Sequence, residues 1–156
     1  MIRIVSLVLI AILFAACETT ETRVSKTILL DGSYGSIIYD GVITRSEVGS
    51  KILVTIDKIS LEYVKDARFN KTENAELVVV QLVATKRVEG EENAPRKVLH
   101  REFQQISVTL NANTPTGKIG GLKFEFPRSL TARADHIGIA LIDSKRMMWP
   151  IRGELK

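Results

Sequence analysis

The stretch KILVTIDKISLEY, residues 51–63, decides the fold class of this chain. Its apolar side chains recur at every second residue, first at Ile52, Val54 and Ile56, then at Ile59, Leu61 and Tyr63. A period of two places alternate side chains on one face of a β-strand. The parity changes across Asp57-Lys58. We therefore expect either an extra residue there, as in a β-bulge, or a bend that carries the strand from one sheet to another.

The strand pattern continues along most of the chain after Ser25. Residues 77–84, LVVVQLVA, are apolar on both parities except at Gln81, which predicts a central strand covered on two sides. Alternation predicts further strands within 106–110, 122–126, 137–141 and 147–151. Pro150 cannot donate a ladder hydrogen bond, so the last of these is expected at a sheet edge. The pattern predicts one all-β domain, an antiparallel β-sandwich or small barrel of about seven to nine strands.

The structure of three further segments is predicted from their local sequence. Asp40-Gly41 lies between apolar pairs and predicts a hairpin turn. Residues 96–105 fit either a strand or a short helix that begins at Pro95, and the alternation after them favours a strand in the C-terminal half. Residues 111–121 are rich in Asn, Thr, Pro and Gly and predict a loop.

The first 16 residues have the three-part layout of a secretory signal peptide. Arg3 is their only charge, residues 4–14 are apolar except Ser6, and the small residues Ala15 and Ala16 precede Cys17. A transmembrane helix would need about 20 apolar residues, and this run is shorter. Residues 18–25, ETTETRVS, are polar and without periodicity, so we expect residues 17–25 to form a flexible tether before a domain that spans 26–156.

Phe14-Ala15-Ala16-Cys17 resembles the lipobox of bacterial lipoproteins, in which Leu usually stands where this chain has Phe14. The resemblance covers residues 1–17. It implies that a diacylglyceryl group is joined to the Cys17 sulfur, that a lipoprotein signal peptidase cuts before Cys17, and that the new amino group is acylated. Such proteins are often kept at the inner membrane when Asp follows the cysteine. Glu18 therefore favours an outer-membrane lipoprotein that faces the periplasm.

Composition limits the remaining classes of protein. Cys17 is the only cysteine, so its lipidation would leave the domain without a disulfide or a thiol ligand. The chain carries 22 Lys and Arg against 18 Asp and Glu, a net charge of +4, and its basic pairs are interleaved with acids. This mixed surface does not resemble a basic stripe with aromatic residues, so we expect no nucleic-acid partner.

Few residues form a pattern that could carry out catalysis. The stretch TPTGK at 114–118 lacks the first glycine of a phosphate loop, and Ile119 stands where a magnesium-binding hydroxyl would be required. His100 and His136 are the only histidines and do not form a short-spaced ligand pair. Asp135-His136 lacks a nucleophile-elbow pattern nearby. We therefore predict no catalytic, metal-binding or cofactor-binding residue.

Two hypotheses on function follow from these observations. The favoured one is a non-catalytic lipoprotein, held in the membrane by lipid on Cys17, whose β-sandwich binds or positions another envelope protein or polymer. Its candidate contact surface is Met147 and Trp149, on the strand that contains Pro150, because that proline discourages strand addition and leaves side chains to make contacts. The alternative is a small tethered periplasmic hydrolase or metal-dependent enzyme that uses His100 or His136.

Overall fold

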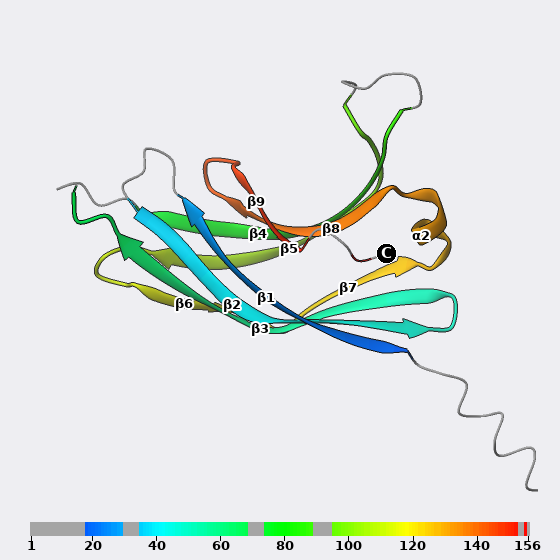
Figure 1. Ribbon diagram of the computed structural model, residues 1–156, viewed down its shortest axis with the longest axis horizontal. Coiled ribbons are helices and arrows are strands. Elements are labelled where there is room, and N and C mark those ends of the chain that lie inside the picture. The colour runs from blue at the N-terminus through cyan, green and yellow to red at the C-terminus, as the bar shows by residue number, and fades with distance from the viewer. Residues whose placement is uncertain (1–17, 30–34, 69–73, 89–94, 153–154, 156) are drawn as a thin grey trace, which may run out of the picture.

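The structure is a computed structural model that describes residues 18–29, 35–68, 74–88, 95–152 and Leu155 (Figure 1). The expected signal peptide and Cys17 lie outside these residues. The described part contains nine strands and one short helix, namely β1 (Thr19–Leu29), β2 (Gly35–Val48), β3 (Lys51–Lys65), β4 (Ala75–Lys86), β5 (Lys97–Leu110), β6 (Thr116–Ile119), β7 (Leu122–Pro127), α2 (Ser129–Arg133), β8 (His136–Asp143) and β9 (Met148–Arg152).

The strands form two antiparallel sheets that pack face to face, which confirms the predicted β-sandwich (Figure 1). Sheet A has the order β1-β2-β3-β6, and β7 also pairs with β3. Sheet B has the order β5-β4-β8-β9. The chain changes sheet after β3, after β5 and after β7, so each sheet combines early and late segments. The predictions that residues 77–84 lie in a central strand and that Pro150 lies in an edge strand are both confirmed.

The core lies between the two sheets. Ile52, Val54 and Ile56 of β3 are fully buried, as are Val80, Leu82 and Ala84 of β4. Phe124 and Phe126 of β7 complete this packing, each at most 1% exposed. Within the described residues, no helix is long and apolar enough to cross a bilayer.

The bulge expected at Asp57-Lys58 is present in β3. Val42 of β2 pairs with Lys58, and the next residue, Ile43, pairs with Ile56, so Asp57 is the extra residue. This extra residue keeps Ile56 and Ile59 on the same side, and both are fully buried. The other neighbours of β3 change at the same place, because β7 pairs with β3 up to Ile56 and β6 pairs with it from Ile59.

The turn predicted at Asp40-Gly41 is wrong, because β2 continues through both residues. Gly41 lies opposite the bulge, where a Cβ atom would be 2.6 Å from the carbonyl oxygen of Lys58. Gly120 is in a similar position, where a Cβ atom would lie 2.3 Å from the carbonyl oxygen of Asp57. Both glycines are therefore required by close approach to the bulge.

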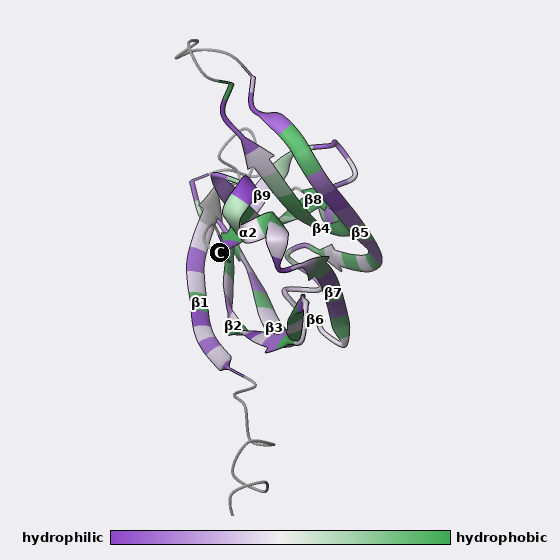
Figure 2. Ribbon diagram, turned by 90° about the vertical axis from the view of Figure 1, so that its right-hand side faces the viewer, coloured by the Kyte–Doolittle hydropathy of each residue, from purple (hydrophilic) through white to green (hydrophobic). Residues whose placement is uncertain are grey.

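The flexible tether predicted for residues 17–25 is also wrong from Thr19 onward. Thr19–Leu29 forms β1, which pairs with β2 from Thr19↔Ser46 to Leu29↔Ser36. β1 is largely hydrophilic along its length (Figure 2). An edge strand whose side chains mostly face solvent shows no apolar period, but its threonines suit extended backbone. The folded domain therefore begins at residue 19 and not at 26.

The two remaining ambiguous segments are both extended. Residues 97–110 form a single strand, β5, which settles the choice between strand and helix for residues 96–105. The segment predicted as a loop at 111–121 contains the short strand β6. Gly121, directly before β7, has a φ of 70°, a conformation that glycine adopts without steric cost.

Candidate functional site

The outer face of sheet B, which points away from sheet A, carries a group of apolar side chains. We call this group the apolar outer face; its members are Val79, Val83, Phe103, Ile142, Met148 and Pro150. The register places them in rows across four strands, one of which runs from Phe103 through Gln81 and Ala140 to Pro150. Phe103 is 53% exposed and Met148 is 52% exposed. No described helix or strand lies over this face (Figure 1).

Two polar side chains, Arg101 and Gln81, lie among the apolar residues of this face. The guanidinium of Arg101 lies 5.8 Å from the ring centroid of Phe103, a distance typical of a cation–π contact. Gln81, in the middle of the face, is only 2% exposed, and its Nε2 has no hydrogen-bond partner. A buried donor without an acceptor costs free energy, but this atom is covered by its neighbours and is not accessible to a partner.

The candidate contact residues Met147 and Trp149 are placed differently from each other. Met147 precedes β9 and is 45% exposed. Trp149 pairs with Leu141, and its half-buried side chain packs against the core between the sheets. Met148, one residue earlier, pairs with Ile142 on the opposite side of sheet B. The structure therefore assigns the exposed apolar surface of β9 to Met148, whereas a contact role for Met147 and Trp149 stays a prediction.

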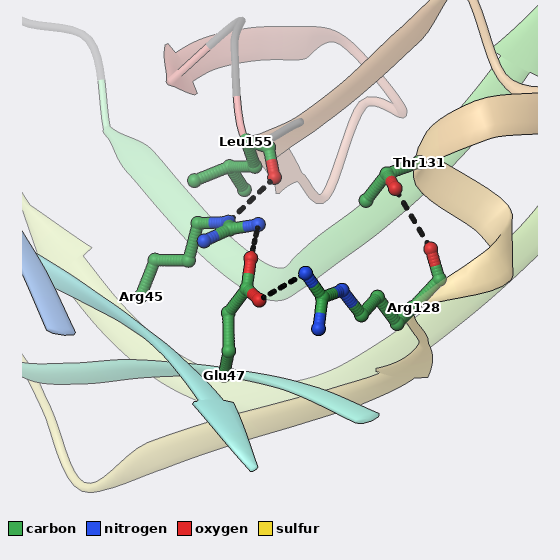
Figure 3. Close-up of polar contacts among 5 residues, drawn as sticks. All are labelled: Arg45, Glu47, Arg128, Thr131 and Leu155. Carbon is green, nitrogen blue, oxygen red and sulfur yellow. Dashed lines mark hydrogen bonds and ion pairs between the residues drawn. The ribbon is translucent and has the colours of Figure 1, made fainter. Parts of the chain in front are cut away.

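A cluster of charged side chains lies at the end of the sandwich where β1 begins (Figure 3). Here the core-facing side of β2 changes from the buried Ile43 to Arg45 and Glu47. Arg45 Nη2 lies 2.8 Å from Glu47 Oε1, and Arg128 Nη2 lies 3.1 Å from Glu47 Oε2. Arg45 Nε also donates to the carbonyl oxygen of Leu155 at 3.2 Å. The cluster thus joins β2, the start of α2 and the C-terminal segment.

The environment of Glu47 stabilises its carboxylate. Its side chain is 15% exposed. The hydrogen bond from Arg45, with the positive charges of Arg128 and Arg45, holds the pKa of Glu47 below its ordinary value of 4.5 although partial burial opposes the shift. A cavity of about 310 Å³ adjoins the cluster and is lined by Glu18, Thr20, Thr22, Ile43, Arg45, Glu47, Arg152 and Leu155. Both of its buried charges already pair with protein groups, so the cavity does not define a ligand.

A second cavity, of about 300 Å³, lies over β2, β3 and β6 on the outer face of sheet A. Asp40, Glu62 and Lys118 contribute its charged side chains. The pKa of Asp40 is lowered by its hydrogen bond and charge interaction with Arg23, whose Nε lies 2.9 Å away. This exposed ion pair with β1 is structural and gives the cavity no evident chemistry.

The two histidines lie on opposite faces of sheet B. His100 pairs with Ala84, a core position, whereas His136 pairs with Thr85, the next residue along β4. Adjacent residues of a strand point to opposite faces, so the two rings cannot share one metal ion. Asp135 accepts a hydrogen bond from the backbone N–H of Arg87, at 2.5 Å, and so fixes the end of β4. Within the described ranges, no three side chains of His, Cys, Asp or Glu are placed to hold a metal ion.

No protein-family model, curated protein or solved structure matches the chain. The apolar outer face was not predicted as a site, although the sequence contained a signal for it. Residues 77–84 are apolar on both parities, and the structure uses only one of these two sets for the core between the sheets.

Proposed function

We propose that this protein is a membrane-anchored lipoprotein of the bacterial envelope, whose β-sandwich binds or positions another envelope component without catalysing a reaction. The observation that carries this proposal is the apolar outer face of sheet B. β4 has the composition of a strand covered on two sides, yet Val79 and Val83 on its outer side stay half-buried beside the exposed Phe103. Exposed apolar patches of this kind mark interaction sites.

The composition of the apolar outer face favours a protein as the partner. Phe103, Met148 and Arg101 belong to residue types that are enriched in protein–protein interfaces. A polysaccharide would instead require several side chains that donate and accept hydrogen bonds, whereas Gln81 at the centre of this face is only 2% exposed. A partner that packs on Phe103 and Met148 would cover the two strongly exposed apolar side chains of this face.

The anchoring part of the proposal is supported by Phe14-Ala15-Ala16-Cys17, which resembles a lipobox. One acyl chain gives only reversible membrane binding, whereas two or more give stable anchoring. We therefore expect the protein to fractionate with membranes. Glu18 at the second mature position favours the outer membrane, facing the periplasm.

Photo-crosslinking tests the partner-binding role. A photoreactive phenylalanine analogue at Phe103, in the full lipidated chain, should form a discrete crosslinked product in intact cells. The matched control is the same analogue at Ile38, which is 37% exposed on the outer face of sheet A. A defined product from position 103 and not from 38 supports the proposal. Equal yields from both positions, or none from position 103, would contradict it.

Anchoring is tested separately with Cys17→Ser. The substitution removes the sulfur that would accept the lipid, so palmitate incorporation should be lost and the precursor should remain uncut. A Ser25→Ala variant, which leaves residues 1–17 intact, should still be labelled. Palmitate labelling that persists in Cys17→Ser would refute lipidation at this residue.

A further inference from the structure

We infer that one end of the β-sandwich rests directly on the lipid surface. We call it the anchor end and define it by Val48, Lys51, Arg128 and Arg133. The inference depends on the proposed lipidation of Cys17 and adds to it an orientation of the domain. The partner at this end is therefore the bilayer that holds the lipid chains, and the apolar outer face of sheet B remains open to the periplasm.

The link between Cys17 and the folded domain is too short to lift the domain from the bilayer. β1 begins at Thr19, which pairs with Ser46. The carbonyl oxygen of Glu18 already accepts a hydrogen bond from the backbone N–H of Glu47, at 3.0 Å. Because an extended residue spans at most about 3.6 Å, the lipidated residue lies within one residue length of this bond.

Backbone contacts place the other members of the anchor end beside Glu47. Val48 follows Glu47 and pairs with Lys51 across the two-residue turn that joins β2 to β3. The carbonyl oxygen of Ser50, in this turn, accepts a hydrogen bond from the backbone N–H of Arg128, at 2.8 Å. α2 starts at the next residue and ends at Arg133. The lipid attachment point, the turn and α2 are thus at the same end of the molecule.

The side chains of the anchor end suit a bilayer surface. Val48 is 55% exposed although it is apolar. Cationic groups lie at the same end: Lys51 pairs with Val48 across the turn, the side chains of Lys51 and Arg128 are 59% and 62% exposed, and Arg133 is exposed in the last turn of α2. An apolar side chain flanked by cations fits the boundary between acyl chains and anionic headgroups.

Three acidic residues also lie at this end. Glu47 is mostly buried and pairs with Arg45 and Arg128. Glu125 Oε1 lies 2.5 Å from Lys51 Nζ. Glu18 is exposed and would face the headgroups. These three acids balance the three cations of the anchor end, so the lipid anchor, rather than net charge, provides most of the attachment.

Fluorescence quenching in vesicles can test this orientation. Lipidation occupies the sulfur of the single native cysteine, so a cysteine introduced by Val48→Cys is the only free thiol and can carry an environment-sensitive dye. The matched control is Asn113→Cys, an exposed position in the loop before β6. That loop lies at the other end, because the carbonyl oxygen of Pro115 accepts the N–H of Tyr63 near the start of β2. β2 alone has 14 residues and spans about 45 Å.

Both labelled proteins are placed, with their lipid, in vesicles of phosphatidylethanolamine and phosphatidylglycerol that contain a phospholipid with a nitroxide near its headgroup. We expect the dye at position 48 to lose emission and shift to shorter wavelength, and the dye at 113 to be unchanged. Quenching at 113 alone, equal quenching at both positions, or no quenching at either would overturn the inference. Palmitate measured on the same samples separates the two proposals, because a sample without palmitate refutes the anchor itself.

A charge substitution provides a second test. Arg133→Gln, in the protein labelled at position 48, should weaken the quenching in vesicles that contain phosphatidylglycerol and leave it unchanged in vesicles of phosphatidylcholine alone. Lys118→Gln, which removes an exposed cation from β6, is the matched control and should have no effect. If both substitutions weaken the quenching equally, the headgroups do not contact α2 and the orientation is wrong.

Discussion

At Gly41 the backbone of β2 passes so close to β3 that a side chain cannot be accommodated. We predict that Gly41→Ala lowers the free energy of unfolding by about 1–3 kcal/mol, because the new methyl group would lie 2.6 Å from the carbonyl oxygen of Lys58 and the strands must shift apart. Urea denaturation measures the change. Val42→Ala, at an adjacent residue that is 40% exposed, should change stability by less than about 0.5 kcal/mol. Equal effects from the two substitutions would show that close approach is not the cause.

Gly41 and Asp57 also show what can be predicted at the level of single residues. The bulge at Asp57 was predictable because the change of parity lies within one strand and is visible in consecutive residues. The role of Gly41 was not, because it depends on a bulge in the neighbouring strand. Its sequence context, Asp-Gly between apolar pairs, is the same as that of a hairpin turn.

Among the elements, β7 is a strand whose backbone forms hydrogen bonds with side chains of the opposite sheet. Gln104 Nε2 of β5 donates to the carbonyl oxygen of Lys123, and Glu102 Oε2 accepts the N–H of Glu125 at 3.2 Å. These bonds occupy backbone groups of β7 that no neighbouring strand of sheet A pairs with. β5 therefore protects an edge that could otherwise pair with another chain.

We predict that Gln104→Ala lowers the free energy of unfolding by about 1 kcal/mol, because it leaves the carbonyl oxygen of Lys123 without this donor. Hydrogen exchange should also become faster for the neighbouring backbone N–H of Glu125, because β7 loses one of the bonds that hold it to β5. Gln105→Ala is the matched control, because Gln105 is the adjacent residue, has the same side chain and is exposed on the other face. Loss of protection in both variants to the same degree would contradict the proposed bridge.

The element boundaries that were hard to predict have a common physical cause. Residues 96–105 could be a strand or a helix because local spacing fits both, and pairing with β4 over most of their length decides for the strand. β1 was missed because its polar residues are stabilised by hydrogen bonds to β2 rather than by burial. β7 was predicted because its buried and exposed residues alternate, and β8 because its large apolar residues alternate with Gly138 and Ala140.

For the molecule as a whole, Glu47 is the residue that holds separate parts of the chain together. We predict that Glu47→Gln lowers the urea midpoint at pH 7, because it removes the carboxylate that pairs with Arg45 and Arg128. The pKa of Glu47 is lowered in the folded state, so its contribution to stability is present above pH 4.5 and is lost as the pH falls through the folded value. The difference between variant and wild type should therefore shrink in acid. A difference that stays constant from pH 7 to pH 3 would contradict this assignment.

The candidate binding surface is also a property of the whole molecule. The sequence indicated that β4 is apolar on both sides but could not show which elements would cover each side. Only the order of the strands reveals that no other sheet packs on the second side, with Val79 and Val83, among the described residues. The sequence also could not show which face of the sheet Trp149 lies on. We predicted a contact surface for it, whereas its ring packs against the core.

The repeated change of sheet along the chain has a consequence for the export that we propose, because it delays folding. Sheet A lacks β6 and β7 until residues 116–127 are available, and sheet B lacks β8 and β9 until residues 136–152 follow. Contacts between residues distant in sequence form slowly, because the intervening loop must close first. In the export that we propose, a chain that enters a translocation channel from its N-terminus could therefore complete neither sheet before residues 116–152 are synthesised, which would keep it competent to pass through the channel.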